Sequence, residues 1–296
     1  MVFLLPCRIS ARFQPGSQSP EFGAGDSLFP RLYYLGYESE KVMTVVGKSW
    51  SSYYQIASFT DRFATAGGDA SGSFNAGTDG GKTGTGRADN VLQVRTLIDF
   101  LPANYLKPFS LNIQVQNNEP IPGVDGAHYG LSFGISAILQ TQKDYTIGLA
   151  YNRAQINDQA NSALINAGIR GDAEALLIGS RWFSDDGYIG GLISRLKNHE
   201  TTNEKIYYNG VGMELFGQYQ IVNHVWGMLG WNYLKPDKNQ PRAGQYQVKS
   251  RIIGLRYTID DFRRMIFVEA RIDNGLTAAG NTLPDSVSVG IRWDWP

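Results

Sequence analysis

Hydrophobic and polar residues alternate along most of this chain. The pattern is clearest at 110–116, where leucine, isoleucine and valine alternate with asparagine and glutamine. A second alternating run spans 129–140 and a third spans 145–152. Because successive side chains of a β-strand point to opposite faces, each run predicts a strand with one apolar face and one polar face.

Similar runs cover much of the remaining chain. They lie at 87–99, 172–184, 187–199, 208–222, 224–236, 245–260, 263–275 and 286–295, and two more precede residue 50. Together with the three runs above, they predict about 13 strands, most of them long enough to cross a bilayer at a tilt. In the last run, the face expected to meet lipid consists of Val287, Val289, Ile291, Trp293 and Trp295.

The connections between the predicted strands alternate in length. Short joins lie near 38–41, 141–144, 185–187, 222–224 and 260–263. Long joins lie near 50–86, 117–128, 155–171, 198–207, 235–246 and 274–285, and the join near 100–107 is somewhat long for a short position. Up-and-down strands place successive connections on opposite rims, so the sequence predicts an all-β fold, an antiparallel transmembrane β-barrel.

Composition is consistent with a barrel wall. The chain has 34 glycines, 16 tyrosines, 42% hydrophobic residues and a mean hydropathy of -0.26. No stretch approaches the roughly 18 consecutive apolar residues of a membrane helix, whereas alternating strands average to moderate hydropathy. Tyrosine and tryptophan lie mostly near the predicted strand ends, as in interfacial aromatic girdles, although tyrosine also favours strands in general.

Charge and motif content exclude several functional classes. The 27 basic and 27 acidic residues balance, and no basic run indicates a nucleic-acid partner. His128, His199 and His224 have no metal-ligand spacing and form no group with serine and aspartate, so neither a metal, a cofactor nor an enzyme is predicted. The 80–83 run Gly-Gly-Lys-Thr lacks the spacing of a phosphate loop, and the lone Cys7 has no partner for an internal disulfide.

The connection at 50–86 is unusually long and rich in glycine. Turn-forming residues recur at 59–63, 67–69 and 77–82, where glycine and aspartate adopt conformations that other residues resist. Segments of this length without regular structure are usually functional or disordered. This connection is therefore the first candidate for a functional element.

Short sequence blocks around this connection carry a resemblance to a known family. They are Val46-Gly47-Lys48-Ser49-Trp50, Thr60-Asp61, Gly67-Gly68-Asp69, Gly86-Arg87 and Val115-Gln116. In their order and spacing the chain resembles the general diffusion porins of enterobacterial-type outer membranes, from about Arg31 to Trp295. The resemblance implies a 16-stranded trimeric barrel whose third loop, here about 50–86, folds into the pore and opposes acidic residues to a basic cluster on the wall.

The same resemblance implies a pore constriction. Asp61 matches an acid of the constriction loop, with Asp69 in the neighbouring block, and a second family acid falls at Thr65, where its charge is lost. Arg31 and Arg87 match two arginines of the wall. The alternatives are that Asp61 caps a turn and that the arginines form salt bridges at the rim. Strand phase also predicts a solvated, inward-facing lining formed by Glu214, Arg256, Glu269, Arg271 and Arg292.

The N-terminal part departs from the family pattern. Residues 1–26 are atypical, and the barrel is expected to occupy 27–296, which corresponds to strands four to sixteen of the family. The first three strands are expected to be absent. The apolar run at 2–5 is much shorter than the core of a signal peptide.

These features predict an outer-membrane porin. It would form a water-filled channel for small hydrophilic solutes and ions, contact outer-membrane lipid and, when complete, assemble as a homotrimer. Two alternatives stay open: a surface adhesin or phage-receptor barrel with a plugged lumen, and a nonfunctional fragment with two unpaired sheet edges in lipid.

Overall fold

The structure is a computed structural model and describes residues 7–13, 28–74, 78–99, 106–157, 161–200, 206–260 and 264–293. Within these ranges no helix is long and apolar enough to cross a membrane. The elements of the first half are β1 (Cys7–Phe13), β2 (Leu28–Glu38), β3 (Val42–Trp50), α1 (Tyr54–Ala57), β4 (Arg87–Ile98), β5 (Phe109–Gln116), β6 (Glu119–Pro120), β7 (His128–Gln140) and β8 (Tyr145–Ile156). Those of the second half are α2 (Ser162–Ala167), β9 (Ala173–Phe183), β10 (Gly187–Glu200), β11 (Tyr207–Val222), β12 (Val225–Pro236), η1 (Pro241–Ala243), β13 (Val248–Asp260), β14 (Arg264–Asp273) and β15 (Ser286–Trp293).

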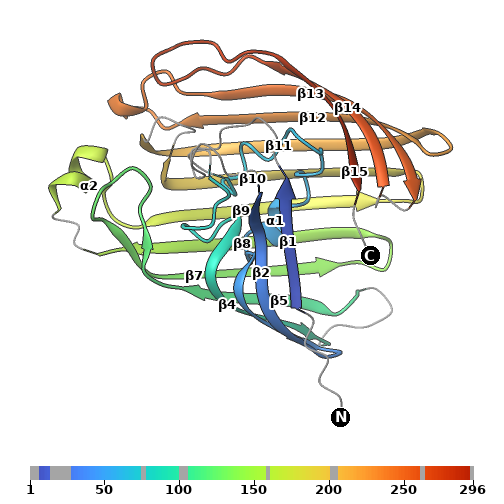
Figure 1. Ribbon diagram of the computed structural model, residues 1–296, viewed down its shortest axis with the longest axis horizontal. Coiled ribbons are helices and arrows are strands. Elements are labelled where there is room, and N and C mark those ends of the chain that lie inside the picture. Colours follow the sequence, from blue (N-terminus) through green and yellow to red (C-terminus); the bar gives the residue numbers. More distant parts are fainter. Residues whose placement is uncertain are drawn as a thin grey trace.

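All strands belong to one antiparallel sheet in which chain order is also spatial order. The sheet runs from β1 to β15, with the two-residue β6 attached to β7 off the main path. It curls around the connection between β3 and β4 (Figure 1). Among the described strands β1 and β15 are not paired with each other, so they form the two ends of the order. The predicted all-β, antiparallel architecture is confirmed.

The predicted strands all occur, with bounds that differ from the predictions by a few residues. The structure adds β1, which lies within the segment 1–26 for which no strand is predicted from the sequence. It pairs with β2 from Cys7↔Leu35 to Phe13↔Leu28. Apolar and polar residues do alternate in β1, but an alternating run of only 7 residues does not by itself identify a strand. The strand forms because β2 provides its hydrogen-bond partners.

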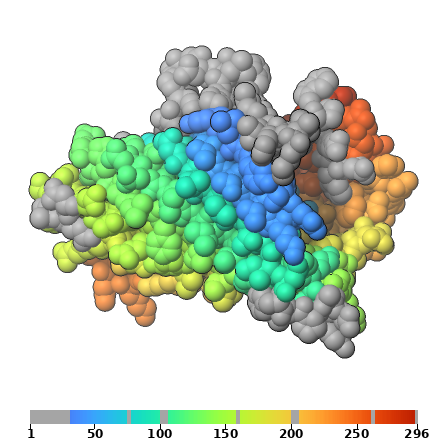
Figure 2. Space-filling view, turned by 90° about the horizontal axis from the view of Figure 1, so that it is seen from below, coloured from blue at the N-terminus to red at the C-terminus, as the bar shows by residue number. Residues whose placement is uncertain are grey.

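The two faces of the sheet differ in chemistry as the sequence predicts. The outer face exposes large apolar side chains, such as Ile253 and Leu255 of β13, while the alternate positions Gly254 and Arg256 are buried. Seen from one side, β2 and β3 (blue), β4 and β5 (teal) and β7 and β8 (green) form one continuous outer surface (Figure 2). An apolar outer face and a polar inner face are what a barrel wall in lipid requires.

The last strand has the predicted phase. Val287, Val289 and Ile291 are 70–74% exposed on the outer face, and Trp293 lies on the same face. Trp295 lies outside the described residues. Val289 faces Val268 of β14, and both residues are in the middle of their strands.

Several long connections pack together at one rim. Ile121 and Val124, which follow β6, lie in one apolar cluster with Leu164 of α2 and Tyr207 at the start of β11. The Tyr207 hydroxyl donates to the Pro122 carbonyl at 2.7 Å. These contacts give the long-connection rim an apolar core of its own.

Candidate functional site

The residues 51–86, called the inner segment here, connect β3 to β4 and are described except for 75–77. The two ends of the segment meet, because the Ser51 amide donates to the Gly86 carbonyl at 2.9 Å and Trp50 pairs with Arg87. Between these ends the chain lies against the inner face of the sheet, with α1 inside the curve of the strands (Figure 1). The inner segment is therefore the element that occupies the interior.

The first part of the inner segment fits against glycines of the wall. Ile56 of α1 lies over Gly148 and Gly179, and a Cβ at Gly148 would be only 2.3 Å from the Ile56 Cδ1 atom. The Phe59 carbonyl lies over Gly190, where a Cβ would be 2.4 Å from its oxygen. Because glycine has no side chain, the chain can approach the wall closely here.

The later part of the inner segment makes the same kind of contact. A Cβ at Gly212 of β11 would lie 1.8 Å from the Ala70 carbonyl oxygen, and one at Gly230 would lie 2.4 Å from the Phe63 ring. The glycines alternate with apolar residues in the sequence, but the pattern alone assigns them only to the inner face. The structure shows that they form the surface on which the inner segment rests.

Replacing Gly212 with alanine should displace the inner segment. The added Cβ would overlap the Ala70 carbonyl, and such overpacking costs about 1–3 kcal/mol. The urea midpoint of unfolding in detergent should fall. Gly217→Ala is the matched control, because a Cβ at that glycine of the same strand would be 3.8 Å from its nearest neighbour. Equal midpoints for the two variants would contradict the close approach.

Glu214 of β11 holds the inner segment at two points. Its side chain is fully buried, at 0% exposure, and accepts hydrogen bonds from the Ala70 amide at 2.7 Å and the Ser71 amide at 2.6 Å. Its second oxygen accepts from the Thr60 hydroxyl. A carboxylate that receives several N–H and O–H donors is well suited to fix an irregular chain, because each donor would otherwise be buried without a partner.

Glu269 of β14 performs the same task further along. It accepts from the Ala64 amide at 2.7 Å, and from the Thr65 amide and hydroxyl at 2.9 Å each, and it is 2% exposed. The sequence interpretation of Glu214 and Glu269 as part of a solvated lining is therefore wrong. Their side chains face inward as predicted, but the inner segment covers them and donates hydrogen bonds to both oxygens of each carboxylate.

Asp69 is held to the wall at β14. Its carboxylate forms a 2.5 Å ion pair with Arg271 of β14, and Arg271 also pairs with Asp273 at 2.7 Å. The Asn232 amide lies 3.4 Å from the same Asp69 oxygen. Burial raises the pKa of the Asp69 carboxyl, while the Arg271 charge lowers it. Asp69 thus fastens the inner segment to β14, and its charge is paired.

Asp61 has a different environment from Asp69. Its carboxylate accepts from the Tyr54 hydroxyl at 2.7 Å, and the Tyr54 ring stacks on Trp50 with 3.9 Å between centroids. Among the described residues no backbone amide donates to this carboxylate, so it does not cap a turn there. Burial raises the pKa of the Asp61 carboxyl, the Tyr54 hydrogen bond opposes this rise and the Asp69 charge adds to it.

Arg31 and Arg87 lie at the same aromatic group. The guanidinium of Arg31 is 5.8 Å from the Trp50 ring centroid and that of Arg87 is 5.4 Å from it. A register shift between β1 and β2 lies opposite Arg31. Arg87 is 8% exposed and its Nε atom is 3.3 Å from Asp79, so the salt-bridge alternative describes part of its role. The structure thus brings Arg31, Asp61 and Arg87 around Trp50 and Tyr54, while Thr65 and Asp69 are held at β14.

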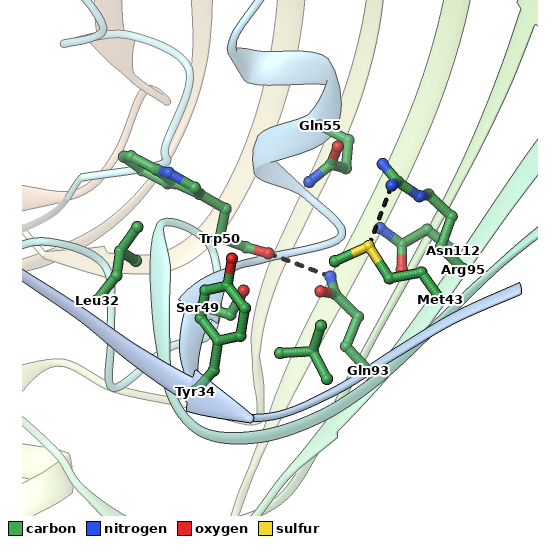
Figure 3. A pocket seen from close by; sticks show the side chains of 10 residues that line it. Leu32, Tyr34, Met43, Ser49, Trp50, Gln55, Gln93, Arg95 and Asn112 are labelled. Carbon is green, nitrogen blue, oxygen red and sulfur yellow. Dashed lines mark hydrogen bonds between the residues drawn. The ribbon is translucent and has the colours of Figure 1, made fainter. Parts of the chain in front are cut away.

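A cavity of about 120 Å³ lies between α1 and the strands β2–β5. Figure 3 shows Gln55 of α1 on one side and Gln93, Arg95 and Asn112 of the wall on the other. Within it the Gln93 side chain donates to the Trp50 carbonyl at 3.2 Å. The cavity is thus bounded by the inner segment on one side and by the wall on the other, and amide, aromatic and cationic groups contribute to its lining.

A curled antiparallel sheet with an apolar outside, a polar inside and a long connection folded against the inner face has the fold of the porin-type β-barrels. No protein-family profile matches the sequence, and no curated protein does. Among solved structures, the chain is similar to Salmonella typhi OmpF in complex with daunomycin, with a TM-score of 0.71 and 19% identity over 91% of this chain and 79% of OmpF.

Two further structures have the same fold. The outer membrane channel DcaP of Acinetobacter baumannii has a TM-score of 0.64 and 14% identity, over 91% of this chain and 76% of DcaP. The anion-selective porin from Comamonas acidovorans has a TM-score of 0.61 and 11% identity, over 93% of this chain and 76% of that porin. These neighbours are outer-membrane porins and channels of Gram-negative bacteria, and they confirm the predicted fold and the predicted resemblance.

Proposed function

We propose that this chain forms a water-filled channel in the outer membrane, through which small hydrophilic solutes and ions diffuse passively. The observation that carries the proposal is the inner segment, whose backbone is held on the polar inner face by Glu214 and Glu269 while the outer face is apolar. The proposal treats 27–296 as the channel domain, to which β1 adds one further strand through its pairing with β2. Charges on a narrow aqueous path sort solutes by size and sign without any bond being made.

The channel proposal is tested by conductance. Folded protein, recognised by its heat-modifiable gel mobility, should produce stepwise current increases when it is added to a planar bilayer in potassium chloride. Folded protein that inserts but produces no steps would favour the adhesin or receptor barrel. A chain that never acquires the heat-modifiable form would favour the nonfunctional fragment.

The constriction is proposed at Arg31, Asp61, Thr65, Asp69 and Arg87. Support comes from the position of Asp61 on the inner segment and of Arg31 and Arg87 on the wall, all around the Trp50 and Tyr54 rings. Thr65 contributes no charge, and the Asp69 charge is paired with Arg271. Asp61 is therefore the acid in this set expected to influence ion selectivity most.

Replacing Asp61 with asparagine should shift selectivity away from cations without changing the fold. The substitution removes one charge and no apolar packing, and the Tyr54 hydroxyl retains an acceptor. The reversal potential in a potassium chloride gradient should move toward the chloride equilibrium potential. Asp99→Asn is the control, because Asp99 is 53% exposed and pairs with Lys41 at the end of β4. A reversal potential equal to that of the control would exclude Asp61 from the ion path.

The same residue predicts a pH dependence. Its pKa is raised by burial, so the carboxylate is protonated at a higher pH than an ordinary aspartate as the pH falls. Above this pKa the negative charge is present, and below it the charge is lost. The cation permeability of the wild type should thus decline on acidification, whereas Asp61→Asn should lack this component.

A homotrimer is also proposed for the assembled channel. One neighbour, OmpT of Vibrio cholerae, is described in a trimer form, and it has a TM-score of 0.54 to this chain. Chemical cross-linking of the folded protein in detergent should produce a trimer band, and a monomer band alone would contradict this assembly.

A further inference from the structure

Four arginines gather on the inner face near the rim of short connections. Arg181 lies close to the end of β9, Arg256 close to the end of β13 and Arg292 close to the end of β15, while Arg62 belongs to the inner segment. These strand ends lead to or lie at the rim where β9 turns tightly into β10. The four residues are called the arginine cluster here.

Aromatic rings position Arg62 and Arg181 of the cluster. The Arg62 guanidinium lies 4.1 Å from the Tyr188 ring centroid, and the Arg181 guanidinium lies 4.4 Å from that of Phe59. These two aromatic residues are themselves joined, because the Tyr188 hydroxyl donates to the Phe59 carbonyl at 2.6 Å. Guanidinium groups stacked on rings keep their N–H edges available for a planar acceptor.

The other two arginines extend the cluster across the interior. Arg256 donates to the Arg62 carbonyl at 2.8 Å and is 5% exposed, so it supports the inner segment as well as carrying charge. The positive charges of Arg62 and Arg292 lie close enough to interact electrostatically with the Arg256 guanidinium. Arg292 is exposed, on the strand position that faces inward beside Met265. The cluster therefore runs from a buried guanidinium to one that faces solvent.

The acidic residues of β13 and β14 near the cluster also have other partners. The Glu269 carboxylate attracts the Arg256 guanidinium electrostatically. The two oxygens of Glu269 also accept hydrogen bonds from the Ala64 and Thr65 amides. No described carboxylate lies within ion-pair distance of Arg62 or Arg181. Asp260, the acid at the end of β13, is paired with Arg264 at 2.6 Å.

We propose that the arginine cluster is a binding site for multivalent oxyanions, such as phosphates and polycarboxylates, on the short-connection side of the inner segment. Stacked guanidinium groups offer paired N–H donors that match the oxygens of these anions. The site gives the channel a preference for such solutes. This preference rests on the proposed channel function, whereas binding of the anion does not.

The test measures binding and conduction separately. Inorganic phosphate and citrate are titrated into the detergent-solubilised protein by calorimetry, and each is added on the short-connection side of a channel conducting potassium chloride. Both anions should bind and reduce the chloride current. Arg62→Gln should raise the half-blocking and dissociation constants on the order of tenfold, because a charge-assisted donor pair is lost. Arg62→Lys should recover part of the affinity.

Arg195→Gln provides the matched control, since Arg195 is an exposed arginine of β10 paired with Asp237 outside the cluster. Its binding constants should equal those of the wild type. Equal affinity of wild type and Arg62→Gln for both anions would overturn the site, even if the channel conducts. Binding that depends on Arg62 in a protein without conductance would uphold the site and reject the channel function. Block by citrate alone, or by phosphate alone, would identify which oxyanion the site takes.

Discussion

Replacing Glu214 with alanine is expected to release the inner segment and to widen the channel. The change leaves the Ala70 and Ser71 amides without their acceptor in a fully buried place. It also removes one acceptor of the Thr60 hydroxyl, which can still donate to the Ala57 carbonyl at 3.3 Å. Each orphaned donor costs about 1–3 kcal/mol, so the free energy of unfolding should fall on the order of 3 kcal/mol. Single-channel conductance should rise, because Glu214 holds both the outgoing and the returning part of the inner segment.

Two variants separate this effect from a general loss of stability. Glu214→Gln keeps one acceptor oxygen at nearly the same volume, so its conductance should lie between those of wild type and Glu214→Ala. Glu174→Ala removes a glutamate of β9 that bonds to Lys197 and Tyr151 without contacting the inner segment. It should leave conductance unchanged. An unaltered conductance in Glu214→Ala would show that other contacts hold the segment.

Replacing Val289 with arginine is expected to prevent stable folding in the membrane. Val289 is 74% exposed on the outer face and lies in the middle of β15. An arginine on the lipid face near the bilayer midplane costs about 2–4 kcal/mol, and the cost falls toward the interfaces. The fraction of heat-modifiable protein and the urea midpoint should both decrease.

The neighbouring positions provide the comparison. Ile291→Arg on the same face lies nearer the strand end and should have a smaller effect than Val289→Arg. Arg292→Ile lies on the other face, so it should fold like the wild type while it weakens phosphate binding. If Arg292→Ile folded worse than Val289→Arg, the assignment of inner and outer faces would be reversed.

The sequence by itself determined which stretches are strands and which face of each is apolar. Alternation with a period of two is a local property, and each strand needs only its own residues to show it. Connection lengths then determined that the strands run up and down around one sheet. The exception was β1, whose short run is recognisable as a strand only when β2 lies beside it.

The sequence also determined the inward phase of Glu214, Glu269 and Gly212, but not their partners. These residues contact 60–71, which lies about 140 to 205 positions away for the two glutamates. Such contacts depend on how the connection folds back across the wall, and an irregular segment has no periodicity from which this path could be read. A solvated carboxylate and a carboxylate that holds a loop look identical in the sequence.

The same limit applies to the charges of the candidate sites. Sequence motifs drew attention to Asp61 and Asp69 together, yet only the tertiary structure separates the aspartate paired with Arg271 from the one bonded to Tyr54. The arginine cluster joins Arg62 to residues of three separate strands, and no spacing of these arginines in the sequence predicts that they lie together. Local patterning determined the wall of this protein, whereas long-range hydrogen bonds and ion pairs, which exist only once the sheet has curled, decided what occupies its interior.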